Sequence, residues 1–265
     1  MKLNISHTTQ YAYDAPVIYG LQQLRLTPQS SVHQTVGDWS VMIEGGAQEL
    51  SFYDQYQNKT TLVQAEPGVT KLDLTVSGEV ETHTGNGIYG KIYSAAPLWH
   101  FKQTTPRTEP GKGITKLSKL ITRKGDTLAG LHALSEAVLA AAPYNISLTS
   151  SGTTAEDALG LGGGVCQDHA QIFIAAARFA GIPARYVSGY LMMNDRVDQD
   201  ASHGWAEAHV DGLGWVGFDV SNGYSPDERY VRIATGRDSR DAAPVTGMRF
   251  GNAQESLIVS LQIQQ

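Results

Sequence analysis

Apolar and polar side chains alternate along most of the first hundred residues. Leu72, Leu74 and Val76 show the pattern, because a single polar residue separates each from the next. A period of two is typical of strands that bury one face, and Asn58 and Lys59 stand where a hairpin turn is expected. The pattern predicts an antiparallel β-sandwich-like module with strands near 3–7, 21–28, 39–43, 50–56, 60–64 and 72–82.

The stretch from 101 to 113 differs from both of its neighbours. It is polar, contains two prolines, and separates the alternating pattern from a helical one. Clusters of Pro and Gly are typical of connections between folded units. We therefore expect an N-terminal module at 1–104 and a second domain at 105–265.

Apolar residues recur with a period close to 3.6 beyond that stretch, which predicts helices. A first helix is expected over 114–121, ending near 124–125. Asp126 can cap a second helix. Thr154, with Asp157 three residues later, resembles the capping box that opens a short helix.

A further helix follows the sequence GGGVCQDHA at 162–170, and Gly181 and Pro183 end it. The pattern predicts one buried stripe, formed by Val165, His169, Ile172, Phe173, Ala176, Phe179 and Ala180. Alternation then returns, and we expect strands near 186–193, 202–210, 215–220, 230–233 and 257–263. The last of these can pair back with the N-terminal module.

Composition narrows the class of protein. The 265 residues include 41% hydrophobic and 17% charged side chains, which is ordinary for a soluble globular protein. A formal net charge of −6 argues against nucleic acid as the main partner. No apolar run has the length of a membrane span, and the N-terminus lacks the apolar core of a signal peptide. We therefore expect a cytoplasmic protein without a membrane partner.

Cys166 is the single cysteine, which excludes an internal disulfide. Its expected place at a helix N-terminus favours an anion and therefore a thiolate. A nucleophilic cysteine usually needs an imidazole partner, and His203 in ASHGWAEAHV is the best candidate. Asp219 in GLGWVGFDVSNG can orient that imidazole, because a turn at 211–214 would make the two strands hairpin neighbours.

The motifs GVCQDHA, AGIPARYVSGY, SHGWAEAHV and GLGWVGFDVSNG, in this order and spacing, resemble the bacterial transglutaminase-like superfamily. The leading QYAYDAPVIYGLQQLRLTP resembles the N-terminal module that accompanies this core in bacterial proteins. The resemblance implies an α+β fold with a papain-like core. Gly204 and Val220 depart from the family pattern, in which Ala and Pro are expected.

Residue by residue, the resemblance implies Cys166 as nucleophile, His203 as general base and acid, and Asp219 as the orienting carboxylate. The backbone N–H of Cys166 is a plausible oxyanion donor, because a helix start presents it to the same carbonyl. Tyr144 and Gln167 are candidates for a second donor. Trp205 is a candidate for the wall of the cleft.

Other polar residues have simpler interpretations. His169 falls on the apolar stripe, so we expect it to pack rather than to react. Glu207 is expected to pair with Arg185 inside the core. Eight histidines without an HExxH or CxxC spacing give no reason to expect a metal site, and no cofactor is expected.

The favoured function is hydrolysis of an amide bond in a peptide or protein through an acyl-enzyme. Family members also include crosslinking acyl transferases, in which an amine replaces water. A non-catalytic binding module on the same fold is an alternative from another class, and the N-terminal module can instead serve to recruit a partner. The sequence identifies neither the substrate nor the oligomeric state.

Overall fold

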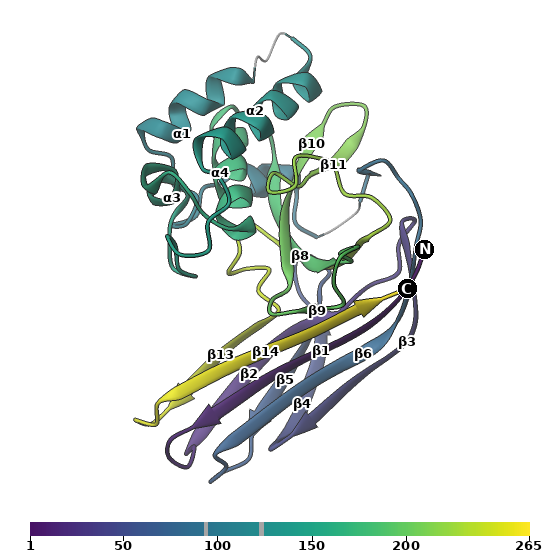
Figure 1. Ribbon diagram of the computed structural model, residues 1–265, viewed down its shortest axis with the longest axis vertical. Helices are drawn as coiled ribbons and strands as arrows, with labels where there is room; N and C mark the ends of the chain where they lie inside the picture. Colours follow the sequence, from purple (N-terminus) through teal and green to yellow (C-terminus); the bar gives the residue numbers. More distant parts are fainter. Residues whose placement is uncertain (93–94, 122–124) are drawn as a thin grey trace.

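The computed structural model describes residues 1–92, 95–121 and 125–265. A two-layered β-sandwich forms one end of the molecule, and a sheet with helices packed on one face forms the other (Figure 1). The fold is α+β, and the paired strands named below are antiparallel.

The sandwich is built from the first third of the chain, its last segment and the short strand β9. One sheet has the order β3-β6-β1-β14-β9 and the other the order β13-β2-β5-β4. Leu72, Leu74 and Val76 are fully buried between the sheets, as the alternating pattern predicts. The strands are β1 (Lys2–Tyr13), β2 (Tyr19–Thr27), β3 (Gln34–Glu44), β4 (Gly46–Tyr53), β5 (Lys59–Ala65), β6 (Lys71–Thr82), β9 (Asp198–Gln199), β13 (Val245–Phe250) and β14 (Glu255–Gln264).

Both ends of the chain lie in this sandwich. Strand β14 pairs with β1 along its whole length, from Asn4 opposite Gln264 to Tyr13 opposite Glu255. Strand β13 pairs with β2 in the other sheet. Figure 1 shows the two termini close together at the end of the sandwich. The sandwich is therefore completed by residues that follow the helices in sequence.

A third sheet, here called the core sheet, has the order β12-β8-β10-β11-β7. Its strands are β7 (Ile88–Gly90), β8 (Ala184–Leu191), β10 (His203–Val210), β11 (Gly214–Phe218) and β12 (Tyr230–Gly236). Helix α4 (Cys166–Phe179) packs on it, and α1 (Lys112–Leu117), α2 (Thr127–Ala141) and α3 (Ala155–Leu161) pack around α4. The short 3₁₀ helices are η1 (Leu98–Lys102) and η2 (Ser118–Leu120). Phe173 of α4 stacks on Phe218 of β11 with ring centroids 4.8 Å apart.

Helix α4 is buried on nearly all sides, which differs from the single stripe that the sequence predicts. Residues 168–178 are all buried, because helices α1, α2 and α3 surround the faces that the core sheet leaves open. Phe179, which the stripe included, is instead 51% exposed at the end of the helix. A helix covered all round stays in place as a rigid support for its first residue.

The caps of the other helices agree with the sequence. The Asp126 carboxylate accepts a 3.1 Å hydrogen bond from the backbone N–H of Ala129 at the start of α2. The Thr154 hydroxyl accepts one of 3.2 Å from the N–H of Asp157 at the start of α3. Helix α1 is shorter than predicted, since 3₁₀ geometry replaces it at Ser118. Its expected end near 124 falls among residues that the structure does not describe.

The stretch 101–113 is packed against α4. Phe101 is 1% exposed, and its carbonyl accepts a 2.9 Å hydrogen bond from Nε of the buried Arg178. The same guanidinium donates to the Thr108 hydroxyl at 3.1 Å. The connection is therefore folded onto the helix, although its composition resembles a free linker.

An apolar cluster joins the sandwich to the core sheet. Leu3, Ile5 and Leu261 of the sandwich pack with Val231 and Ile233 of β12. No helix in the described ranges 1–92, 95–121 and 125–265 is long and apolar enough to cross a membrane.

Candidate active site

Cys166 is the first residue of α4 and is partly exposed. Asp168, two positions on, accepts a 2.9 Å hydrogen bond from the N–H of Val165, which fixes the entry to the helix. A Cβ on Gly164 would lie 2.7 Å from the Asp168 side chain, so only glycine fits there. The first N–H groups of a helix lack partners within it and carry its positive dipole end. Cys166 thus lies where a negative charge is favoured.

The segment after α2 runs beside Cys166. Tyr144 forms a parallel bridge with Gly164, and the N–H of Asn145 donates to the Gly164 carbonyl at 2.8 Å. Burial raises the pKa of Tyr144, and the charges of Cys166 and Asp219 add to the effect. Tyr144 is 56% exposed, so its ring borders Cys166 at the surface.

His203 and Asp219 meet at one end of the hairpin formed by β10 and β11. His203 opens β10, and Asp219 directly follows the last residue of β11. The ladder pairs Ala206 with Phe218, which brings the two side chains to the same end of the sheet. Nε2 of His203 donates to Oδ2 of Asp219 at 2.6 Å.

The charge of His203 is set by its two neighbours. Burial lowers its pKa, but hydrogen bonds to Asp219 and Cys166, together with the charges of both groups, outweigh burial and raise the pKa to about 10. Since Nε2 faces Asp219, Nδ1 is the nitrogen left for Cys166. A protonated imidazole in that place favours the thiolate form of a cysteine.

Asp219 is held by more than His203. Its Oδ2 atom also accepts hydrogen bonds from the Tyr230 hydroxyl at 2.6 Å and from Nδ2 of Asn222 at 2.7 Å. Burial raises the pKa of Asp219, but the hydrogen bond and charge of His203, with the donors Tyr230 and Asn222, outweigh it and hold the pKa below its usual value. The carboxylate is therefore ionised and fixed. Nothing in the sequence pattern assigned this role to Tyr230 or Asn222.

His169 has a structural place. Its Nε2 atom lies 2.6 Å from the Ala142 carbonyl, which can only accept, so Nε2 carries the proton. Nδ1 then accepts from the Ser221 hydroxyl at 2.7 Å. Burial lowers the pKa of His169, so the ring is neutral. It ties α4 to the loop that carries Asn222, which agrees with packing rather than reaction.

The remaining candidates lie around this centre in different ways. The Gln167 side chain donates to the Ser151 carbonyl at 3.4 Å. Trp205 is 1% exposed and stacks against His203, with ring centroids 6.2 Å apart, so it backs the imidazole rather than lining an open surface. A Cβ on Gly204 would lie 2.0 Å from the Tyr186 hydroxyl, which explains the glycine in place of the family's alanine.

Glu207 and Arg185 form the predicted buried ion pair beneath the site. Their side chains are 0% and 2% exposed and approach to 2.6 Å. Arg232 adds a second guanidinium to the same carboxylate at 3.0 Å. The Arg185 guanidinium also lies 3.8 Å from the ring centroid of Trp215. This cluster fixes β8, β10 and β12 relative to one another.

Known proteins resemble this chain in sequence and in fold. "Uncharacterized protein ML0607" of Mycobacterium leprae is 29% identical over 279 residues, covering 99% of this chain and 98% of the relative. "Uncharacterized protein Rv2569c" of Mycobacterium tuberculosis is 26% identical, covering 97% and 90%. The crystal structure of a "Putative Cysteine Protease" from Cytophaga hutchinsonii matches with a TM-score of 0.80 and 22% identity, covering 100% of this chain and 91% of that one.

Two family models match separate parts of this chain. The transglutaminase-like superfamily matches residues 115–220, which include Cys166, His203 and Asp219, and the bacterial transglutaminase-like N-terminal region matches residues 3–81 of the sandwich. The match to the transglutaminase-like superfamily supports an enzyme in general, and the likeness to the Cytophaga hutchinsonii structure shows the shared fold. Residues 115–220 therefore match the transglutaminase-like superfamily, and residues 3–81 match the bacterial transglutaminase-like N-terminal region.

Proposed function

We propose that the protein hydrolyses amide bonds in peptides through a thioester on Cys166. His203 would act as general base and acid, and Asp219 as the carboxylate that orients it. The observation that carries the proposal is the 2.6 Å hydrogen bond between His203 and Asp219, with the other ring nitrogen left for Cys166. A thiol, an imidazole and a carboxylate in series are what nucleophilic amide cleavage needs.

The reaction runs in two balanced steps. The Cys166 thiolate attacks the amide carbon, the carbon–nitrogen bond breaks, and the His203 imidazolium gives its proton to the leaving amine. The neutral imidazole then takes a proton from water, whose oxygen attacks the thioester. The carbon–sulfur bond breaks, the acid leaves, and the thiolate and imidazolium are restored.

The negative charge on the carbonyl oxygen needs donors during both steps. The backbone N–H of Cys166 is suited to this, because it belongs to the first turn of α4 and has no acceptor within the helix. Tyr144 is our candidate for the second donor, since it borders Cys166 at the surface. The Gln167 side chain is turned to Ser151, which leaves its backbone N–H as its available donor.

Exposed apolar residues beside the nucleophile favour a peptide substrate. Tyr144 and Ile146 are 56% and 75% exposed, and Leu148, 41% exposed, packs against Gly163 just before the site. Exposed apolar side chains grouped at a reactive centre are typical of recognition surfaces. We propose that they contact apolar side chains of the peptide on the acyl side of the bond. We expect the reaction in the cytoplasm, where a single thiol stays reduced.

Hydrolysis and acyl transfer share the first step and differ in the second. The name of the Cytophaga hutchinsonii protein favours cleavage, and the superfamily name equally fits transfer of the acyl group to an amine. The test is incubation with a proteome-derived peptide library, with and without a fluorescent primary amine. We expect new peptide termini, identified by mass spectrometry, that are absent with Cys166→Ser. Amine-labelled peptides in excess over cleaved ones would establish transfer instead. If neither product forms, the binding-module alternative is favoured.

A further inference from the structure

Strand β12 lies at the edge of the core sheet and carries Tyr230, which donates to Asp219. Its inner edge pairs with β8, but the register shifts between Arg232 and Ala234. Such a bulge interrupts the ladder, so the inner pairing alone fixes the strand poorly. The ion pair of Arg232 with Glu207 helps to hold β12 at this point, and the place of Tyr230 depends in addition on what holds the outer edge of the strand.

Two side-chain amides from the sandwich hold that outer edge. Gln34 donates from Nε2 to the Arg232 carbonyl at 2.8 Å and accepts at Oε1 from the Arg232 N–H at 2.9 Å. Asn58 makes the same pair of bonds with Thr235, both 2.8 Å long. Each amide satisfies both backbone groups of one residue, as a neighbouring strand would.

The two amides are themselves fixed. Asn58 donates from Nδ2 to Asp54 at 3.0 Å, and Asp54 is ion-paired with Arg25 at 3.2 Å. Gln34 also donates from Nε2 to the carbonyl of Gln29 at 2.9 Å. Both amide residues are 4% exposed. Buried, fully bonded amides specify one position for the groups they bind.

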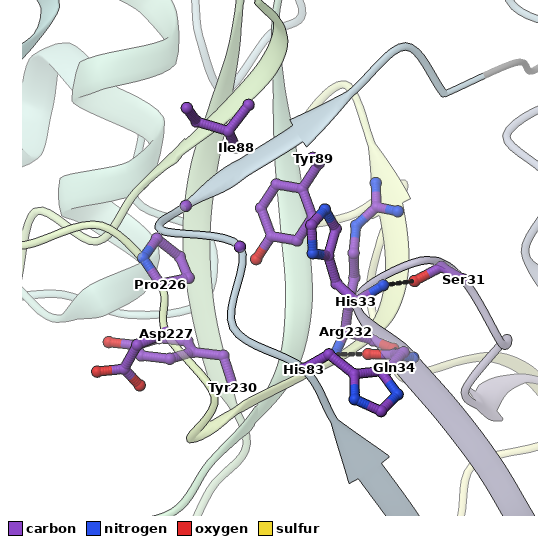
Figure 2. Close-up of a pocket in the computed structure, with 12 residues that line it drawn as sticks. Ser31, His33, Gln34, His83, Ile88, Tyr89, Pro226, Asp227, Tyr230 and Arg232 are labelled. Atoms are coloured by element: carbon purple, nitrogen blue, oxygen red, sulfur yellow. Dashed lines mark hydrogen bonds between the residues drawn. The ribbon is translucent and has the colours of Figure 1, made fainter. Parts of the chain in front are cut away.

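A cavity beside Gln34 brings sandwich and core residues together. It is lined by His33, Gln34 and His83 from the sandwich side and by Tyr230 and Arg232 from β12. Figure 2 shows the hydrogen bond between Gln34 and Arg232 and places Tyr230 on the same segment. Tyr230, which donates to Asp219, thus lies only two residues before Arg232, which binds Gln34 of the sandwich.

We propose that Gln34 and Asn58 are positioning residues for the reaction, through which the N-terminal module sets β12, and through β12 the Tyr230 hydroxyl on Asp219. The proposal rests on the proposed function. It makes the module part of the catalytic apparatus rather than a recruiting device. Misplacement of a reacting group by about 1 Å costs about 100-fold in rate, so a small shift of β12 is enough.

The first test replaces Gln34 by Met, which has a similar length and cannot make either hydrogen bond. The substrate is the peptide cleaved fastest in the library. We expect kcat to fall at least tenfold with KM within twofold of wild type. Gln29→Met is the matched control, because the Gln29 side chain bonds only within its own module, to the carbonyls of Thr27 and Pro28. An unchanged kcat in Gln34→Met would overturn the proposal.

A double mutant separates positioning from general stability. If Gln34 acts through Tyr230, then Gln34→Met combined with Tyr230→Phe should be no slower than Tyr230→Phe alone. Losses that multiply would show that Gln34 acts by another route and would overturn the proposal. Thermal melting identifies any variant that is unfolded at the assay temperature, and Asn58→Leu then replaces Gln34→Met in the same scheme.

A readout without substrate distinguishes this proposal from the proposed function. The pKa of His203 can be followed by NMR titration of its ring protons. Gln34→Met should shift that pKa away from its wild-type value, because Asp219 loses the position that Tyr230 gives it, and Gln29→Met should not. If the wild type cleaves nothing but the shift occurs, the function fails and the positioning stands. If the wild type cleaves peptides but Gln34→Met changes neither kcat nor the pKa of His203, the positioning role is overturned and the proposed function stands.

Discussion

Oδ2 of Asp219 lies 2.6 Å from Nε2 of His203, and the same oxygen accepts from Tyr230 and Asn222. Three donors converging on one buried carboxylate oxygen leave it little freedom to rotate. The imidazole is therefore held with its proton on Nε2 and its Nδ1 atom facing Cys166. This orientation suits a thiol nucleophile, because Nε2 keeps its proton towards Asp219 while Nδ1 gives up and regains the proton that the reaction moves.

Replacement of Asp219 by Asn should lower kcat by about 1,000-fold or more, because the imidazole loses its charge partner and its fixed tautomer. The pKa of His203 should fall below about 10 in this variant. Steady-state kinetics and NMR titration measure the two effects. Asp195→Asn is the control, since it removes the same charge from a side chain that is 69% exposed. If Asp219→Asn and Asp195→Asn have the same kcat and the same pKa of His203, Asp219 has no role in a catalytic triad.

The pH dependence of stability should carry the signature of His203. Its pKa is about 10 in the folded state, against 6.5 for an unperturbed histidine. Its stabilising contribution is therefore fully present below pH 6.5 and is lost as the pH rises through about 10. The free energy of unfolding, measured with urea for wild type and His203→Asn, should differ more at pH 6 than at pH 11. A difference that grows with pH would contradict the assignment.

Replacement of His169 by Phe should destabilise the fold by about 1–3 kcal/mol, because the Ala142 carbonyl and the Ser221 hydroxyl lose a buried partner. Activity of the folded fraction should fall moderately, since Ser221 adjoins Asn222. Urea unfolding and kcat measure both. His83→Phe changes an exposed ring and should leave stability within about 0.5 kcal/mol. Equal stability of the two variants would show that the hydrogen bonds of His169 to Ala142 and Ser221 do not stabilise the fold.

Replacement of Glu207 by Gln should destabilise the protein by about 3–5 kcal/mol, because Arg185 then carries an uncompensated buried charge. The exposed pair of Lys2 and Glu79 offers the comparison, and Glu79→Gln should cost less than about 1 kcal/mol. Chemical denaturation of both variants checks the difference. Wild-type stability in Glu207→Gln would show that the ion pair is not needed for folding.

Local signals in the sequence account for much of the fold and the centre of the site. Strand alternation and helix caps at Asp126 and Thr154 are short-range features, and the structure confirms them. Cys166, His203 and Asp219 could be proposed because each stands in a local motif. Strand β13 escaped notice because Gly247 breaks its alternation, where a Cβ would lie 1.9 Å from Gln22.

The contacts that position the site are long-range and leave no local pattern. Gln34 reaches Arg232 across 198 positions and Asn58 reaches Thr235 across 177. Neither amide differs in the sequence from the other polar residues of an alternating strand or turn. The packing of residues 101–113 against α4 also depends on a distant residue, Arg178, and no pattern within 101–113 predicts that contact.

The most direct test of the account is the loss of amide cleavage as Cys166 is alkylated. It is the single cysteine, so one equivalent of iodoacetamide reports on one site. We predict that activity falls in proportion to the alkylated fraction, measured by mass spectrometry, and reaches zero at one equivalent. Full activity after stoichiometric alkylation of Cys166 would contradict the account.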